Sequence, residues 1–508
     1  MSNTARYSHK VMCSTRSFGE EMLSANSLML LSCIFTTALI SFLIMVPFLH
    51  RWGVKHEILD LPDERKVHHH AIPRLGGIAI CGVLVLTLLL YVDLQREIRG
   101  ILAGVLIIFF TGLMDDLHGI SPLRKFFSEI CAVLATMTIG NLYIRTLGDL
   151  FGTGEIILPY WLAISFTLVA IVGVVNAFNL IDGLDGLSGG VSVITLVAFG
   201  VLAFQTANYE GLVLCAALLG SVLGFLKYNF FPARIFMGDS GSLVIGFVIS
   251  FLSLHLTQGS TGQVQPVVPL LIIGLPVADT LWVMISRLCA RQSPFVADRT
   301  HVHHKFLKLG FSHRNTVFLL YIISLLCAII AVSFRNKQAE LLFGGYIVTS
   351  LLFYLALHFL STRQHLFGLL GRESTSWIRQ SESYRLFSSL LAKTAPPMHH
   401  CFFFAYLVLA LIAGNSEEVT SRLAVRWGSL PLICIMLLTA AWFISHQIRE
   451  FNRRNLGYLI LGLSISMTVM VLSNRDLQAN RSADAWNNSL YRHQGDYDKS
   501  KYLEQMLV

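Results

Sequence analysis

The feature that most constrains the fold is a succession of apolar stretches, each close to 20 residues long, separated by short polar segments. A helix that crosses the hydrocarbon core of a membrane needs roughly 20 mostly apolar residues. Charged residues make up 13% of the 508 residues, about half the share that is usual in a soluble domain. The sequence therefore predicts an all-α fold, a polytopic transmembrane helical bundle. The formal net charge of +8 is too small over this length to indicate nucleic-acid binding.

The apolar stretches divide the chain into a large body and a smaller extension. Eleven spans are expected in a membrane-embedded domain over residues 27–360, followed by a basic cytoplasmic linker at 361–400, a three-span extension at 401–472 and a polar tail at 473–508. The eleven spans lie near residues 27–49, 76–93, 98–114, 126–147, 158–178, 186–205, 210–228, 238–257, 266–286, 316–333 and 340–360.

Lysine and arginine are distributed unevenly between the loops. The loops after the first and the ninth expected span are rich in both, whereas the segment 257–265 carries no charge. Cytoplasmic loops carry the excess of Lys and Arg in membrane proteins. We therefore expect the amino terminus outside and these basic loops in the cytoplasm, in a multi-pass protein of the cell inner (plasma) membrane.

Acidic residues gather at span ends in the loops assigned to the cytoplasm. Asp115 and Asp116 are adjacent and would repel each other without a proton or a cation between them. Mg²⁺ takes oxygen ligands and bridges phosphates. A solvated helix end would explain an isolated Asp-Asp pair equally well. Asp239, followed by two serines, could cap the helix that begins there or bind the metal.

A third acidic segment contains Asn176, Asn179, Asp182 and Asp185. Their spacing of three places them on one face of helical turns, and the glycines that follow permit a tight turn before the next helix, whose start favours anions. A purely structural reason for two amides and two carboxylates between apolar spans is hard to find.

Two basic segments accompany the acids. Lys66 and Arg74 could hold a phosphate, with Gly76–Gly77 letting the backbone approach it, or could simply anchor the loop at the membrane surface. The second segment holds Arg299 and three histidines, namely His301, His303 and His304. Their spacing is not that of a helical zinc pair, and the nine scattered cysteines form no CxxC motif. An Arg and His cluster fits a diphosphate better.

Five acidic positions and a basic loop on one membrane face suit metal-assisted chemistry on phosphates. A secondary transporter or a flippase of envelope precursors is the alternative. A transporter keeps its substrate residues near the bilayer midplane, whereas these clusters lie at span ends.

The motifs, in their order along the chain, are Asp115-Asp116-Leu-His-Gly119, Asn176-Ala-Phe-Asn179-Leu-Ile-Asp182-Gly-Leu-Asp185-Gly, Gly238-Asp239-Ser-Gly-Ser and Asp298-Arg299-Thr-His301-Val-His303-His304. Over residues 27–360 the chain resembles the polyprenyl-phosphate N-acetylhexosamine-1-phosphate transferases, which include the undecaprenyl-phosphate GlcNAc-1-phosphate transferases. The resemblance implies transfer of a sugar 1-phosphate from a UDP-N-acetylhexosamine to a polyprenyl phosphate, with release of UMP and Mg²⁺ (or Mn²⁺) as cofactor. This is the initiating step of cell-envelope polysaccharide synthesis.

The same resemblance implies roles for individual residues. Asp115, Asp116, Asp182 and Asp185 would be catalytic, and one of the first two would accept a proton from the lipid phosphate. Asp239, Asp115 and Asp182 would bind the metal. Substrate-binding roles fall to Asn176, Asn179, Arg299, His301, His303, His304, Arg74 and Lys66. The histidine loop resembles the branch that uses UDP-GlcNAc rather than the one that transfers a MurNAc-pentapeptide. Both direct attack by the lipid phosphate, which we favour, and a covalent aspartyl intermediate stay open, and the extension after residue 360 departs from the family pattern.

Overall fold

A computed structural model describes residues 25–60, 71–92, 94–259, 264–291 and 300–362. Cys33–Pro396 form one compact unit, to which the following description applies. The linker, extension and tail expected after residue 360 lie outside the described residues, apart from the last two residues of a helix.

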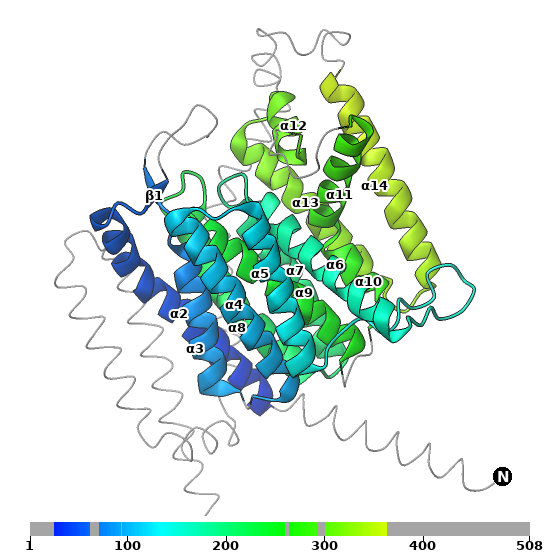
Figure 1. The fold of residues 1–508 in the computed structure, drawn as a ribbon, viewed down its shortest axis with the longest axis horizontal. Helices are drawn as coiled ribbons and strands as arrows, with labels where there is room; N and C mark the ends of the chain where they lie inside the picture. The colour runs from blue at the N-terminus through cyan, green and yellow to red at the C-terminus, as the bar shows by residue number, and fades with distance from the viewer. Residues whose placement is uncertain (1–24, 61–70, 93, 260–263, 292–299, 363–508) are drawn as a thin grey trace, which may run out of the picture. The chain divides into compact units, whose positions relative to one another are not determined.

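The described chain is almost entirely helical (Figure 1). The helices are α2 (Ala25–Lys55), α3 (Gly76–Tyr91), α4 (Arg96–His118), α5 (Pro122–Gly140), α6 (Tyr160–Leu180), α7 (Leu187–Gln205), α8 (Tyr209–Asn229), α9 (Gly238–Gln258), α10 (Val267–Ile272), α11 (Gly274–Cys289), α12 (Val302–Lys308), α13 (His313–Ser333) and α14 (Ala339–Thr362). A ribbon of two antiparallel strands, β1 (Leu59–Asp60) and β2 (Ile72–Pro73), pairs Leu59 with Pro73 and Asp60 with Ile72.

Every apolar stretch predicted before residue 360 falls on a helix, and the ninth stretch is divided between α10 and α11. Within the described residues, eight helices are long and apolar enough to cross a membrane, namely α2, α4, α6, α7, α8, α9, α13 and α14. α3 is apolar but has only 16 residues. Length and composition thus support a multi-pass bundle and eight of the expected spans.

Helix α9 forms the centre of the bundle. It packs against α3, α4, α6, α7 and α8, and most of its side chains are buried, as expected of a helix that is apolar all round. Glycines permit this close packing. A Cβ on Gly77 of α3 would collide with the backbone of Gly241, and one on Gly112 of α4 with the backbone of Ser240. The beginning of α9 is therefore held tightly between α3 and α4.

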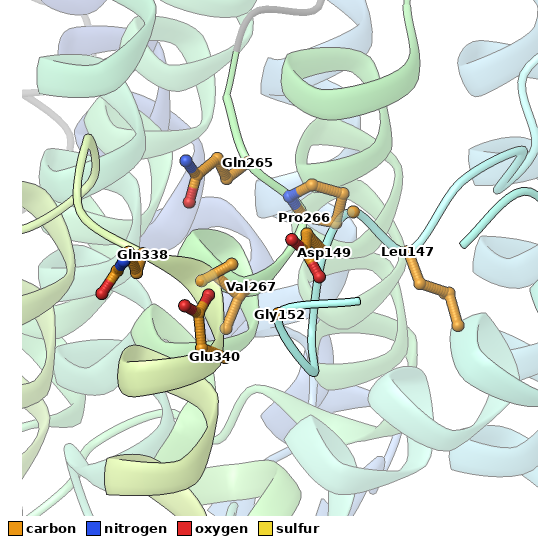
Figure 2. Close-up of a pocket in the computed structure, with 10 residues that line it drawn as sticks. Leu147, Asp149, Gly152, Gln265, Pro266, Val267, Gln338 and Glu340 are labelled. Carbon is orange, nitrogen blue, oxygen red and sulfur yellow. The ribbon is translucent and has the colours of Figure 1, made fainter. Parts of the chain in front are cut away.

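The C-terminal end of α4 meets the N-terminal end of α9, so these two helices run in opposite directions. At the far end of the bundle a cavity of about 380 Å³ lies between the α5–α6 loop, the start of α10 and the start of α14. Figure 2 shows the polar side chains that line it, including Asp149, Gln265, Gln338 and Glu340. None of the acidic residues singled out in the sequence lines this cavity.

Candidate active site

The carboxylate of Asp116 caps helix α9. It accepts hydrogen bonds from the backbone N–H groups of Asp239 (2.8 Å) and Ser240 (3.0 Å) and from the hydroxyl of Ser240 (2.7 Å). The first N–H groups of a helix have no partner within the helix, and a carboxylate placed there also interacts favourably with the helix dipole. Asp116 therefore fixes the C-terminal end of α4 against the start of α9.

Lys125, in the first turn of α5, joins two of the acidic segments. Its Nζ lies 3.2 Å from Asp115 Oδ2 and forms an ion pair with Asp239. The other oxygen of Asp115 accepts the backbone N–H of Ile120 at 2.8 Å. The Lys125 side chain is 14% exposed, whereas that of Asp239 is 31% exposed. One ammonium group is thus shared by two carboxylates that remain open to solvent on one side.

Asp182 lies in the short loop between α6 and α7 and faces the same group of charges. Burial, followed in importance by the nearby charges of Asp239, Asp185 and Asp116, raises the pKa of its carboxyl to about 7. A carboxyl disfavours ionisation when it is desolvated beside like charges. The negative charge around Asp182 is therefore incompletely balanced by the protein.

The other polar residues of the segment 176–185 contact different parts of the bundle. Asn179 Oδ1 accepts a hydrogen bond from the Ser242 hydroxyl of α9 at 2.8 Å. Asp185 Oδ2 accepts the backbone N–H of Ala233 at 2.9 Å, in the loop before α9. Asn176 points instead toward α5, where its Nδ2 donates to Glu129 at 2.6 Å. The structure thus brings Asn179 and Asp185 to the start of α9 and gives Asn176 a partner within the bundle.

The histidine segment approaches the acidic loop through His303. Its ring is buried, and a Cβ on Gly183 would collide with its Nε2. Burial lowers the pKa of His303, and the neighbouring His304, His301 and His313 lower it further. His303 is therefore neutral near pH 7. The His303 and His304 rings are 4.3 Å apart, between centroids.

His301 is oriented by an acidic residue of α11. Its Nδ1 lies 2.8 Å from Asp279 Oδ2, and the other oxygen of that carboxylate accepts the backbone N–H of Val302 at 2.8 Å. Both side chains are buried. Asp279 thereby fixes the beginning of α12 and the position of the ring of His301.

The first basic segment is only partly described. Arg74 forms an ion pair with Asp60 of β1, and Lys66 and Arg299 lie outside the described residues. The backbone N–H groups of Gly76 and Gly77 donate to the carbonyls of Phe236 and Met237. The expectation that these glycines admit a phosphate is therefore wrong for this structure, because their N–H groups and the space above them are taken by the start of α9.

Comparison with known proteins shows the family to which the chain belongs. The sequence model of the family described as "Glycosyl transferase family 4" matches residues 98–257, which include Asp115, Asp116, Asp182, Asp185 and Asp239. A Bacillus subtilis (strain 168) protein named as a probable undecaprenyl-phosphate N-acetylglucosaminyl 1-phosphate transferase is 36% identical over 307 residues, which are 59% of this chain and 84% of the relative. The chain belongs to the family of the undecaprenyl-phosphate GlcNAc-1-phosphate transferases.

Other relatives carry the same activity in their names. The undecaprenyl-phosphate α-N-acetylglucosaminyl 1-phosphate transferase of Yersinia pestis is 33% identical over 285 residues, 55% of this chain and 78% of the relative. That of Escherichia coli K12 is 32% identical over 292 residues, 56% of this chain and 78% of the relative. This chain is accordingly a multi-pass membrane glycosyltransferase of the class that transfers sugar phosphates to polyprenyl phosphates.

The donor groups of this transferase fit a divalent metal. Asp116 has both oxygens occupied by the start of α9, and Asp185 is held by Ala233. Asp115 and Asp239 share the Lys125 ammonium, and Asp182 lies within reach of the charge of Asp239. Carboxylate oxygens are the ligands that Mg²⁺ uses, and Asp182, Asp239 and Asp115 are the residues that the sequence resemblance assigns to the metal.

Two residues of the transferase site were missed in the sequence. Lys125 looks like an ordinary basic residue at a membrane surface, and no pattern along the chain links it to Asp239, 114 residues away. Asp279 gave a usable signal, because an acidic residue inside an apolar stretch (266–286) is expensive and usually functional. Its partner, 22 residues further on, follows only from the structure.

Proposed function

We propose that this protein transfers N-acetylhexosamine 1-phosphate, specifically GlcNAc 1-phosphate, from the UDP-sugar to undecaprenyl phosphate and releases UMP. The relatives named above supply the lipid and the sugar. The observation that carries the proposal is the convergence of Asp115, Asp239 and Asp182 from three segments, with Lys125 between the first two. With a divalent cation bound, such a group can balance and position several phosphate oxygens at once.

In this reaction an oxygen of the lipid phosphate attacks the β-phosphorus of the UDP-sugar. The bond between that phosphorus and the bridging oxygen breaks, and UMP leaves with the bridging oxygen. We assign proton acceptance to Asp115, because all three donors on Asp116 belong to the start of α9, whereas one oxygen of Asp115 faces only the side chains of Lys125 and Asp239. A covalent aspartyl intermediate is the alternative, but a phosphate monoester is already a nucleophile.

Mg²⁺, with Mn²⁺ as a substitute, is the cofactor that we propose for Asp182, Asp239 and Asp115. When bound, it supplies positive charge that stabilises the phosphate oxygens during transfer. Lys125 contributes a further positive charge beside the same carboxylates. We assign contact with the diphosphate or the sugar to His303 and His304, and the support is the position of His303 beside Gly183 of the Asp182 loop.

We place this site on the cytoplasmic face of the cell inner membrane, where the reaction would begin the synthesis of an envelope polysaccharide. The support is the concentration of Lys and Arg in loops at the same helix ends as the acids.

The test uses the purified full chain with undecaprenyl phosphate and one UDP-sugar at a time. We expect UMP release that is fastest with UDP-GlcNAc, depends on both substrates and stops in excess EDTA. Asp239→Asn should abolish release, whereas Glu155→Gln, an exposed acid in the α5–α6 loop, should leave it unchanged. Undiminished release in EDTA would exclude the metal. Movement of a lipid-linked or free sugar across the membrane without any UMP would instead establish a transporter or flippase.

A further inference from the structure

A second group of titratable side chains lies at the end of the bundle opposite the transferase site. Glu97 is in the first turn of α4, Glu210 in the first turn of α8 and His255 in the last turn of α9. Their donor atoms lie within 4.8 Å of one another. These three residues and Asn208, which precedes α8, take no part in the transfer proposed above and are called the His255 cluster below.

Both ring nitrogens of His255 face oxygen atoms. Nδ1 lies 2.5 Å from Glu97 Oε2, and the ring is 1% exposed. Carboxylates orient metal-bound histidines in this way, through the nitrogen that does not bind the metal. Glu97 therefore fixes the ring with Nε2 directed to the rest of the cluster, and the backbone of Gly259 closes this side, since a Cβ there would lie 2.9 Å from Glu97 Oε2.

The atoms around Nε2 are spaced like the ligands of one ion. Glu210 Oε2 is 3.6 Å from Nε2, which is too far for a hydrogen bond. Two ligands at about 2.1 Å from one tetrahedral ion are roughly 3.4 Å apart. Asn208 Oδ1 lies 3.0 Å from Nε2, close enough to serve as a third ligand. The Glu210 side chain is 31% exposed, which leaves a way in for the ion.

The amide of Asn208 provides an independent sign of a missing ligand. Its Oδ1 accepts the backbone N–H of Gly211 at 2.8 Å, which fixes the orientation of the amide. Its Nδ2 is buried and has no hydrogen-bond partner among the residues that the structure describes. Buried donors without a partner are costly. A water molecule in the coordination shell of an ion at Nε2 would supply the acceptor.

We propose that the His255 cluster binds a first-row transition-metal dication such as Zn²⁺. The ligands are His255 Nε2, Glu210 and Asn208 Oδ1, and Glu97 positions the imidazole through Nδ1. A mixed set of imidazole and carboxylate donors suits such ions, and a dication balances the two carboxylates when the imidazole is neutral. The ion ties together the ends of α4, α8 and α9, two of which carry Asp115, Asp116 and Asp239 at their other ends. The competing explanation is a protonated imidazole held between two carboxylates, with no metal.

The test measures Zn²⁺ binding to the purified full chain after chelator treatment, in excess Mg²⁺, by equilibrium dialysis and elemental analysis. We expect His255→Gln to bind one equivalent fewer than the wild type. Glu97→Gln and Glu210→Gln should weaken that equivalent by about 10-fold or more. Glu210→Gln also serves if His255→Gln does not fold, because it keeps the contact between His255 and Glu97.

Two variants control for other sites. His56→Gln removes an exposed histidine directly after α2, and Asp239→Asn alters the transferase carboxylates, so both should retain the equivalent that His255→Gln loses. Equal binding by the wild type, His255→Gln and Glu210→Gln would overturn the proposal and leave the protonated imidazole. Loss of the same equivalent in His56→Gln would overturn it as well, because the binding would then not depend on the cluster.

Discussion

Replacing Asp116 by alanine should destabilise the protein more than any other single change among the site carboxylates. The substitution removes the acceptor for the backbone N–H groups of Asp239 and Ser240 at the buried start of α9. Each orphaned buried donor costs about 1–3 kcal/mol, and the Ser240 hydroxyl can rotate to another acceptor. The free energy of unfolding should therefore fall by about 2–6 kcal/mol. Asp116→Asn keeps one acceptor oxygen and should lose roughly half as much.

The matched control is Asp115→Ala, one residue away on the same turn. Asp115 accepts the Ile120 N–H of a partly exposed loop and interacts with the side chains of Lys125 and Asp239. Lys125 keeps its ion pair with Asp239 when Asp115 is removed, so the loss should cost about 1 kcal/mol. Both variants should lose transferase activity. Unfolding is followed by intrinsic fluorescence during denaturant titration of the purified protein in detergent. If Asp115→Ala and Asp116→Ala unfold at the same denaturant concentration, the capping role assigned to Asp116 is refuted.

Three further outcomes are expected. The Asp182 carboxyl has a pKa raised to about 7 and is therefore increasingly protonated below that pH. The Mg²⁺ concentration for half-maximal activity should rise up to about 10-fold between pH 7 and pH 6, because the proton competes with the metal. An unchanged Mg²⁺ requirement would argue against Asp182 as a ligand. Gly183→Ala should destabilise the protein by about 1–3 kcal/mol, because the added methyl group collides with His303. Adding His303→Ala should restore the melting temperature, and a double variant no more stable than Gly183→Ala would show that the two residues do not touch. Cys289 is exposed. In a variant that keeps it as the single cysteine, an impermeant thiol reagent should label it from the cytoplasmic side, and labelling from outside would overturn the assigned topology.

The helices were largely predictable because the apolar stretches are long and because helix formation depends on residues that are close together in the sequence. The exception is instructive, since the stretch 266–286 divides at Ile273. Pro276 has no N–H to donate to the carbonyl of Ile272, four residues earlier. Gly274 lowers helix propensity at the same place. Gly274 and Pro276 are visible in the sequence, but the high hydropathy of the whole stretch predicts a single span.

The candidate site was predictable in its residue types and not in its connections. The resemblance assigns Asp116 a catalytic role, whereas its hydrogen bonds to α9, which join residues more than 120 positions apart, follow only from the structure. Sequence spacing suggested a common face for Asn176 and Asn179, yet their partners are Glu129 of α5 and Ser242 of α9. Local periodicity predicts which helix face a residue occupies, whereas its partner depends on how distant helices pack.

The central claim is that the carboxylate group catalyses transfer of a sugar 1-phosphate and not of the sugar alone. The most direct measurement is the nucleotide released when the purified protein, UDP-GlcNAc and undecaprenyl phosphate react, together with the mass of the lipid product. We predict UMP and a lipid whose mass increases by one N-acetylhexosamine phosphate, both absent with Asp239→Asn. Release of UDP, with a lipid that gains only the sugar, would contradict the account.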